Sequence, residues 1–163
     1  RDEVEADHLE QGDVLGVGAF AEVFRGWWRR PVAIKKFRNL TTQNKLDAFA
    51  REVRIHRPLD HPGIVRLYGV CTDLPDMSMV LEQVSGTSFH RLCHERGDAP
   101  WDADEMLGLW LQLADVMDYL HAQGVVHRDL KPSNVLVTEE GLVKLIDLGL
   151  AFVGDPSRIH KAS

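Results

Sequence analysis

Four side chains near the end of the chain could together transfer a phosphoryl group to a hydroxyl. Asp129, Lys131 and Asn134 lie within six residues, and Asp147 follows after one short apolar run. Such a transfer needs a carboxylate beside the attacking hydroxyl, a cation over the moving phosphate and oxygen ligands for Mg²⁺. A charged surface loop is the ordinary alternative for either segment alone. The complete order favours a catalytic loop followed by a metal-binding turn.

A glycine-rich segment near the start could hold the phosphates. Its residues Gly16, Val17, Gly18, Ala19 and Phe20 lie between two predicted strands, so backbone N–H groups could face a nucleotide at close range. A dinucleotide-binding fold would place a helix after the glycines, whereas here a second strand follows. Ala21 occupies the third glycine position of the pattern, and would cost about 1 kcal/mol only if positive φ were needed there.

The N-terminal half is predicted to form a five-stranded antiparallel sheet with one helix. Short apolar runs interrupted by glycines predict three strands between residues 9 and 37. Two further strands are expected at 64–70 and 77–81. Between them, apolar residues at helical spacing follow the capping residues Thr41 and Thr42 and end before Pro58.

The C-terminal half is predicted to be mainly helical. Helices are expected at 88–96 and 103–123, with Gly124 as the cap of the second. The loop with Asp129 follows, and then a hairpin over 134–146. We expect the second helix to bury a stripe at period 3.6, and the Trp27–Trp28 pair to lie in the core or on a sheet face. The stripe comprises Leu107, Leu111, Ala114, Met117 and Leu120.

Composition and charge exclude several other classes of protein. The 163 residues are 44% hydrophobic, enough for a sizeable core, and the formal charge of -6 disfavours nonspecific binding to nucleic acid or acidic membranes. No basic region followed by an apolar run marks a signal peptide, and no segment is apolar enough to span a membrane. Cys71 and Cys93 form no metal-binding pair, which favours an intracellular, cytoplasmic protein.

Taken together, the motifs resemble those of the eukaryotic protein kinase superfamily. The resemblance runs from Gly16 to Gly149 and includes the His127–Asn134 loop and the Asp147–Gly149 turn. It implies an α+β, two-lobed fold, with residues 1–84 as the N-lobe and hinge and 85–163 as an incomplete C-lobe that ends in the activation segment. ATP and Mg²⁺ are the implied ligands, and a protein hydroxyl is the implied acceptor.

The resemblance also assigns individual roles. Lys35 would clamp the α- and β-phosphates and pair with Glu52, although a solvated lysine is the alternative for Lys35 taken alone. Asp129 would accept the hydroxyl proton, Lys131 would neutralise the γ-phosphate, and Asn134 with Asp147 would hold Mg²⁺. His127 is expected to pack, Arg128 to dock a phosphorylated segment, and Leu148 to replace a phenylalanine. The residues implied around adenine are Leu81, Glu82 and Val84 at the hinge and Val23, Ala33 and Leu136 against the base.

Lys131 resembles the lysine of serine/threonine kinases. The segments Val32–Phe37 and His61–Val70 resemble the tyrosine-kinase-like group, whose members mostly phosphorylate Ser or Thr. Phosphorylation of Ser or Thr is therefore the expected activity. A truncated, kinase-like module that binds nucleotide or a partner without catalysis is the alternative, and a tyrosine kinase is a third. The sequence identifies neither the protein substrate nor the upstream activator.

Overall fold

The computed structural model describes residues 2–38, 40–97 and 99–154. The chain forms two compact units, which are considered separately below. Unit 1 comprises residues 1–58 and 66–83, and unit 2 comprises residues 59–65 and 84–163. The short segment 59–65 therefore groups with unit 2, although it lies between two elements of unit 1.

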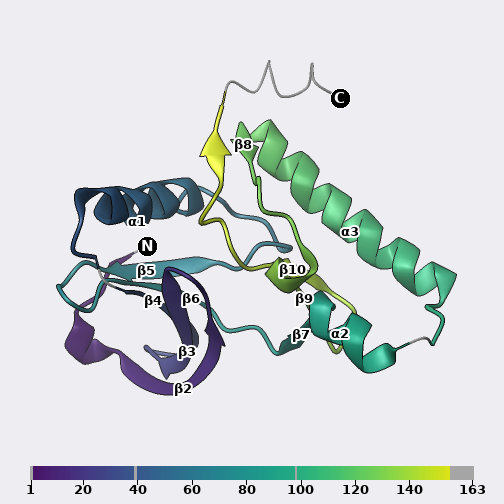
Figure 1. The fold of residues 1–163 in the computed structure, drawn as a ribbon, viewed down its shortest axis with the longest axis horizontal. Helices are drawn as coiled ribbons and strands as arrows, with labels where there is room; N and C mark the ends of the chain where they lie inside the picture. The colour runs from purple at the N-terminus through teal and green to yellow at the C-terminus, as the bar shows by residue number, and fades with distance from the viewer. Residues whose placement is uncertain (1, 39, 98, 155–163) are drawn as a thin grey trace. The chain divides into compact units, whose positions relative to one another are not determined.

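Unit 1 is built on a twisted sheet that carries the glycine-rich turn (Figure 1). The five predicted antiparallel strands are present, in the spatial order β5-β6-β4-β3-β2. A two-residue strand, β1, adds to the outer edge of β5 in parallel and was not predicted. The strands are β1 (Asp2–Glu3), β2 (Glu10–Val17), β3 (Ala21–Trp27), β4 (Pro31–Phe37), β5 (Leu67–Cys71) and β6 (Ser78–Glu82).

One predicted strand boundary is wrong. Strand β5 begins at Leu67 rather than at Ile64. Ile64 instead forms an isolated bridge with Leu145, and the Val65 N–H donates to the Leu145 carbonyl at 3.0 Å. These backbone groups are satisfied within unit 2, so the extended run is divided between the two units.

Helix α1 (Gln43–His56) lies beside β5 on one face of the sheet (Figure 1). Its apolar residues Phe49 and Val53 join the buried cluster on that face, and the Phe49 ring packs edge-on against Phe37 with centroids 4.9 Å apart. A separate cluster on sheet residues holds Trp28 together with Val4, which comes from the segment after β1. Trp27 is half exposed, so only Trp28 is a core residue.

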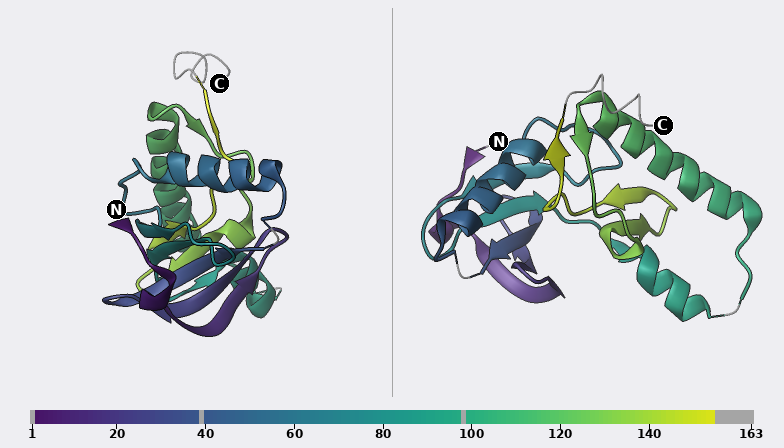
Figure 2. Two further views of the ribbon diagram at one scale, coloured as in Figure 1. Left: turned by 90° about the vertical axis from the view of Figure 1, so that its left-hand side faces the viewer. Right: turned by 45° about the horizontal axis from the view of Figure 1, so that its top comes forward.

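The described part of unit 2 contains two helices and several very short strands (Figure 2). Strands β7, β9 and β10 form one sheet, and β8 pairs with β11. The predicted helices and hairpin are present, whereas β7 and β11 were not predicted. The elements are β7 (Gly86–Ser88), α2 (Phe89–Arg96), α3 (Ala103–Ala122), β8 (Val125–Val126), the 3-10 turn η2 (Pro132–Asn134), β9 (Val135–Thr138), β10 (Val143–Leu145) and β11 (Phe152–Val153).

The buried face of α3 differs from the predicted stripe. Of the predicted positions only Leu120 is fully buried, while Leu107 and Leu111 are 56% and 61% exposed. The helix is apolar on more than one side, so the 3.6-residue period alone does not select which side is buried. Contacts with β8 and β10 select another set of positions. The buried residues are Leu109, Leu113, Val116 and Leu120.

Segment 59–65 is fixed against the end of α3. The Asp60 N–H donates to the Tyr119 hydroxyl at 2.8 Å, and the His61 ring lies 4.8 Å from the Tyr119 ring. A Cβ on Gly63 would come within 2.2 Å of a Val116 methyl carbon, so only glycine permits this approach. Helix α3 ends as predicted, with Gly124 at φ 72°.

Candidate functional site

The loop after β8 gathers the first three candidate catalytic groups around one carboxylate. Oδ2 of Asp129 accepts a hydrogen bond from Lys131 Nζ at 2.7 Å and another from Asn134 Nδ2 at 3.2 Å. The same Asn134 nitrogen also donates to the Asp129 carbonyl at 2.9 Å. Within the described ranges Oδ1 of Asp129 receives no hydrogen bond. The carboxylate is therefore held from one side and keeps an oxygen that can accept a proton.

The donors around Asp129 favour its ionised form. The hydrogen bond from Lys131 is the largest of the effects that lower the pKa of the Asp129 carboxyl below its usual range, and the Asn134 bond acts in the same direction. Partial desolvation and the negative charge of Asp147 oppose this shift but are outweighed. A carboxylate that stays ionised near neutral pH can serve as a proton acceptor.

His127 contacts the backbone of the loop at Asp129. Its side chain is buried, and its Nδ1 accepts the Asp129 backbone N–H at 3.1 Å. Nε2 has no hydrogen-bond partner among the described residues, and burial lowers the pKa of the imidazole. A neutral, buried ring in contact with the Asp129 backbone fits the packing role expected for His127.

Arg128 adopts a left-handed backbone conformation that a sequence pattern does not predict. Its φ is 63°, which an arginine adopts only when surrounding contacts compensate the strain. Here Nε donates to the Leu150 carbonyl at 2.8 Å, and the guanidinium lies 5.5 Å from the centre of the Phe152 ring. Arg128 thus connects the His127–Asn134 loop to the segment that follows Asp147.

Asn134 and Asp147 are brought together by the backbone. The Ile146 N–H donates to the Asn134 carbonyl at 3.1 Å, which sets Asp147 one residue beyond that bond. Oδ1 of Asp147 accepts a hydrogen bond from the Gly149 N–H at 3.0 Å. The neighbouring Leu148 is buried, so this apolar residue packs at the position where the kinase pattern has phenylalanine. Because the Asn134 amide nitrogen binds Asp129, its amide oxygen remains for a cation. A carboxylate and an amide oxygen fit Mg²⁺, which prefers oxygen ligands.

In unit 1 the structure pairs Lys35 with Glu52. Lys35 Nζ lies 2.5 Å from Glu52 Oε1, and the two side chains are only 11% and 4% exposed. The alternation of β4 directs Lys35 to the α1 face of the sheet, where Glu52 on α1 meets it. Lys36 pairs instead with Asp76 and is more exposed. The two adjacent lysines therefore have different partners, and only Lys35 forms a buried ion pair.

The glycine-rich turn joins β2 to β3. The Gly18 N–H donates to the Ala21 carbonyl at 2.8 Å, and Val17 and Phe20 are 66% and 68% exposed. Ala19 is also exposed and Gly16 partly so. Ala21 itself is buried and does not have positive φ, so the substitution of the third glycine causes no backbone strain.

The candidate adenine residues fall in both units. Ala33 and Leu81 are register partners in unit 1 and belong to its buried cluster, against which Val23 packs. The Glu82 N–H already donates to the Arg66 carbonyl at 2.8 Å, and its carboxylate accepts the Arg66 N–H at 3.1 Å. Val84 and Leu136 belong to unit 2 and are half-buried.

Gln112 is a positioning residue that the sequence analysis missed. From α3, its amide nitrogen donates to the Gly141 carbonyl at 2.9 Å and its oxygen accepts the Val143 N–H at 3.0 Å. It thus holds the β9–β10 hairpin, which begins directly after Asn134. The available signal was a single amide side chain within an otherwise apolar part of the helix.

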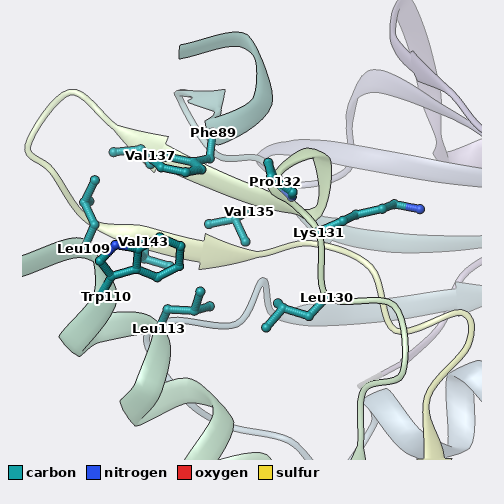
Figure 3. Close-up of a pocket in the computed structure, with 10 residues that line it drawn as sticks. All are labelled: Phe89, Leu109, Trp110, Leu113, Leu130, Lys131, Pro132, Val135, Val137 and Val143. Carbon is teal, nitrogen blue, oxygen red and sulfur yellow. The ribbon is translucent and has the colours of Figure 1, made fainter. Parts of the chain in front are cut away.

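An apolar pocket borders the His127–Asn134 loop in unit 2 (Figure 3). Its volume is about 190 Å³, and it is bounded by Leu130 and Pro132 of the loop together with Phe89, Trp110 and the valines of the hairpin. Lys131 contributes its hydrocarbon stem while its ammonium points away from the pocket (Figure 3). Apolar walls cannot bind a triphosphate, so this pocket is not the candidate site for the phosphate groups.

In the part of the chain that the structure describes, no helix is long and apolar enough to cross a membrane.

The chain is similar to several known proteins. The chain is 39% identical over 149 residues to the probable serine/threonine-protein kinase SIS8 of Arabidopsis thaliana, covering 89% of this chain and 14% of that protein. It is 35% identical over 156 residues to the cytokinesis protein sepH of Aspergillus niger, covering 93% of this chain and 12% of that protein. It is also 36% identical over 143 residues to the tyrosine-protein kinase transforming protein Fps of avian sarcoma virus, covering 86% of this chain and 27% of that protein.

The chain therefore spans between 12% and 27% of the length of these three relatives. The model of the protein kinase domain matches residues 9–160, which is nearly the whole chain. The match includes the glycine-rich turn, the Lys35–Glu52 pair and the loop around Asp129. The chain belongs to the protein kinase domain family.

Proposed function

We propose that this chain binds ATP and transfers its γ-phosphoryl group to a serine or threonine hydroxyl of a protein substrate. The single observation that carries the proposal is the convergence of Lys131 and Asn134 on Oδ2 of Asp129. That arrangement holds an ionised carboxylate beside a cation and leaves one carboxylate oxygen for the hydroxyl. Both features are needed when a neutral hydroxyl attacks an anionic phosphate.

In the proposed step, the substrate hydroxyl oxygen attacks the γ-phosphorus. A new oxygen–phosphorus bond forms while the bond from the γ-phosphorus to the β,γ-bridging oxygen breaks, which releases ADP. The hydroxyl proton passes to Oδ1 of Asp129, because the Asp129 carboxyl is ionised near neutral pH and this oxygen is not held by Lys131 or Asn134. The Lys131 ammonium, 2.7 Å from Oδ2 of the same carboxylate, would neutralise the moving phosphoryl oxygens.

Asn134 and Asp147 are the proposed Mg²⁺ ligands. The bound ion would supply positive charge to the phosphate oxygens and orient them. The Asn134 side chain would then have two tasks, since its nitrogen fixes Asp129 while its oxygen faces the cation. The Asp147 carboxylate is in turn oriented by the Gly149 N–H.

Unit 1 would supply the groups that hold the nucleotide. The Lys35 ammonium, fixed by Glu52, is the proposed partner of the α- and β-phosphates, and the backbone of the turn 16–20 would cover them. Val23, Ala33 and Leu81 would provide apolar contact for adenine. We assign the carbonyl of Glu82 to the adenine edge, because the Glu82 N–H donates to the Arg66 carbonyl.

The preference for Ser or Thr is supported by Lys131 in the loop after Asp129. It is also supported by the similarity to SIS8, which is named a probable serine/threonine-protein kinase. The similarity to Fps makes tyrosine the alternative acceptor. Free Cys71 and Cys93 and the requirement for ATP favour a cytoplasmic setting. A peptide mixture containing Ser, Thr and Tyr acceptors, with phosphoamino-acid analysis of the product, distinguishes the acceptors.

Thermal-shift titration with ATP and Mg²⁺ tests nucleotide binding. Lys35→Ala and Asp147→Asn are expected to reduce the ligand-induced shift, each compared with the same variant without ligand. Lys36→Ala is the matched control, because this lysine is adjacent in sequence but pairs with Asp76. An unchanged shift in both site variants, or an equal reduction in Lys36→Ala, would refute the assigned phosphate groups.

A further inference from the structure

Two exposed histidines lie one turn apart on α2, outside the groups proposed above for catalysis and nucleotide binding. His90 and His94 are four positions apart, which places both side chains on the same face of the helix. Their rings are stacked, with centroids 4.3 Å apart and planes inclined by 28°. The helix therefore presents two imidazoles side by side to solvent.

A backbone hydrogen bond determines which nitrogen of His94 can bind a cation. His94 Nδ1 lies 3.0 Å from the His90 carbonyl oxygen. Because a carbonyl oxygen only accepts hydrogen bonds, Nδ1 must carry the proton, and Nε2 of the neutral ring keeps its lone pair. Metal-binding histidines are commonly held through their other nitrogen in this way. Among the described residues, neither ring makes a further hydrogen bond or an ion pair.

The positive side chains near the two histidines are paired with carboxylates. Arg91 Nε donates to Glu95 Oε1 at 2.5 Å. Arg96 Nη1 lies 3.4 Å from Glu105 Oε2. Since each arginine faces a negative charge, its repulsion of a cation that approaches the imidazoles is reduced.

We propose that His90 and His94 chelate one divalent transition-metal ion of the class of Zn²⁺, Ni²⁺ and Cu²⁺. Imidazole nitrogen suits these ions, and two histidines at i and i+4 on one helix face are a known zinc-binding spacing. A tetrahedral ion at about 2.1 Å from each nitrogen needs the two nitrogens about 3.4 Å apart. Because the ring centroids are already 4.3 Å apart, small rotations of the two exposed rings reach this separation.

The site has the groups for binding a metal but not for metal-assisted hydrolysis. In metalloprotease helices with this spacing, a glutamate directly after the first histidine is the general base, whereas here Arg91 stands there. Within the described ranges no group of three or more His, Cys, Asp or Glu side chains could hold a metal, so water completes the coordination of the ion. The site is independent of the phosphoryl-transfer proposal, because Mg²⁺ prefers oxygen ligands to imidazole.

The test is isothermal titration calorimetry of the full chain with nickel chloride. We expect saturable binding of one Ni²⁺ per chain below about 1 mM. His90→Ala and His94→Ala should each weaken this binding by about tenfold or more, because one imidazole alone loses the advantage of chelation. Excess Mg²⁺ should not displace the Ni²⁺, since the proposed ligands are nitrogens.

His8→Ala is the matched control. The side chain of His8 is 66% exposed, but it lies beside Glu5 rather than beside a second histidine. Cys93→Ser is a second control, because this free thiol lies on α2 but outside the proposed pair. Both variants should keep the affinity for Ni²⁺ within about twofold of wild type, since distant or uninvolved positions act independently. Circular dichroism verifies that each variant is folded.

Three results would overturn the inference. The first is no saturable binding up to about 1 mM Ni²⁺. The second is an equal loss of affinity in His8→Ala and in His90→Ala, which would indicate separate weak sites on single histidines. The third is displacement by excess Mg²⁺, or a loss in Cys93→Ser with both α2 histidine variants unchanged, which would assign the ion to carboxylates or to the thiol.

Discussion

Replacing Lys35 by methionine should destabilise unit 1 strongly, because it leaves the Glu52 carboxylate buried without its ammonium partner. The two charged atoms are 2.5 Å apart, and Glu52 is only 4% exposed. Removing one member of a buried pair typically costs about 3 to 5 kcal/mol, whereas an exposed pair contributes only about 0 to 1 kcal/mol. Methionine keeps the apolar stem, so the lost charge should dominate.

Urea unfolding measures this effect. With a slope of about 2 kcal/mol per molar urea, a loss of about 3 kcal/mol lowers the midpoint by about 1.5 M. The double variant Lys35→Met/Glu52→Leu should recover at least half of the loss, because it replaces both charges by apolar groups. Lys36→Met is the control and should shift the midpoint by less than about 0.5 M, since its pair with Asp76 is exposed.

The reasoning would be refuted if Lys35→Met changed the midpoint no more than Lys36→Met did. It would also be refuted if the double variant were less stable than the single one, because the cost would then not come from the loss of the ammonium beside Glu52. Either outcome would mean that the pair is solvated in spite of its burial in the structure.

Three further predictions concern unit 2. Lys131→Met should raise the pKa of Asp129 by removing the hydrogen bond that lowers it most, so the acid limb of the pH profile of kcat/KM should move to higher pH. Burial lowers the pKa of His127 in the folded state, so the unfolded state takes up more protons as the pH falls below about 6.5. The wild-type protein should therefore lose more stability than His127→Phe over this pH range, as measured by paired unfolding curves. Gly63→Ala should lower the thermal midpoint by several degrees because its Cβ meets Val116, whereas Gly108→Ala, with open space around it, should not lower it.

Much of the fold follows from patterns that are strong over several residues. In the antiparallel strands β2, β3 and β4, apolar residues either alternate with polar ones or form short runs between turns that contain glycine or proline. Helix α1 has apolar residues at helical spacing before Pro58. The strands β1, β7 and β11 have only two or three residues and show no period of their own. Their formation depends on partners distant in sequence, which a local pattern cannot specify.

The same reasoning explains what the sequence could indicate about the candidate site. The types and the order of the residues in one short segment predicted Asp129, Lys131 and Asn134 as site residues, because their chemistry is recognisable there. The left-handed backbone of Arg128 and the double hydrogen bond of Gln112 depend on segments more than twenty residues away. The buried side of α3 was predicted incorrectly because Leu107 and Leu109 are both apolar, and only the packing of the neighbouring strands distinguishes them.

The most direct test compares Asp129→Asn with wild type in nucleotide binding and in phosphoryl transfer to a Ser/Thr peptide. Asparagine keeps the size of the side chain but cannot take the hydroxyl proton at Oδ1. We predict that transfer falls by about 10²-fold or more while the affinity for ATP with Mg²⁺ stays within a few-fold. Transfer that persists at the wild-type rate, or an equal loss of binding and transfer, would contradict the role of Asp129 as the proton acceptor.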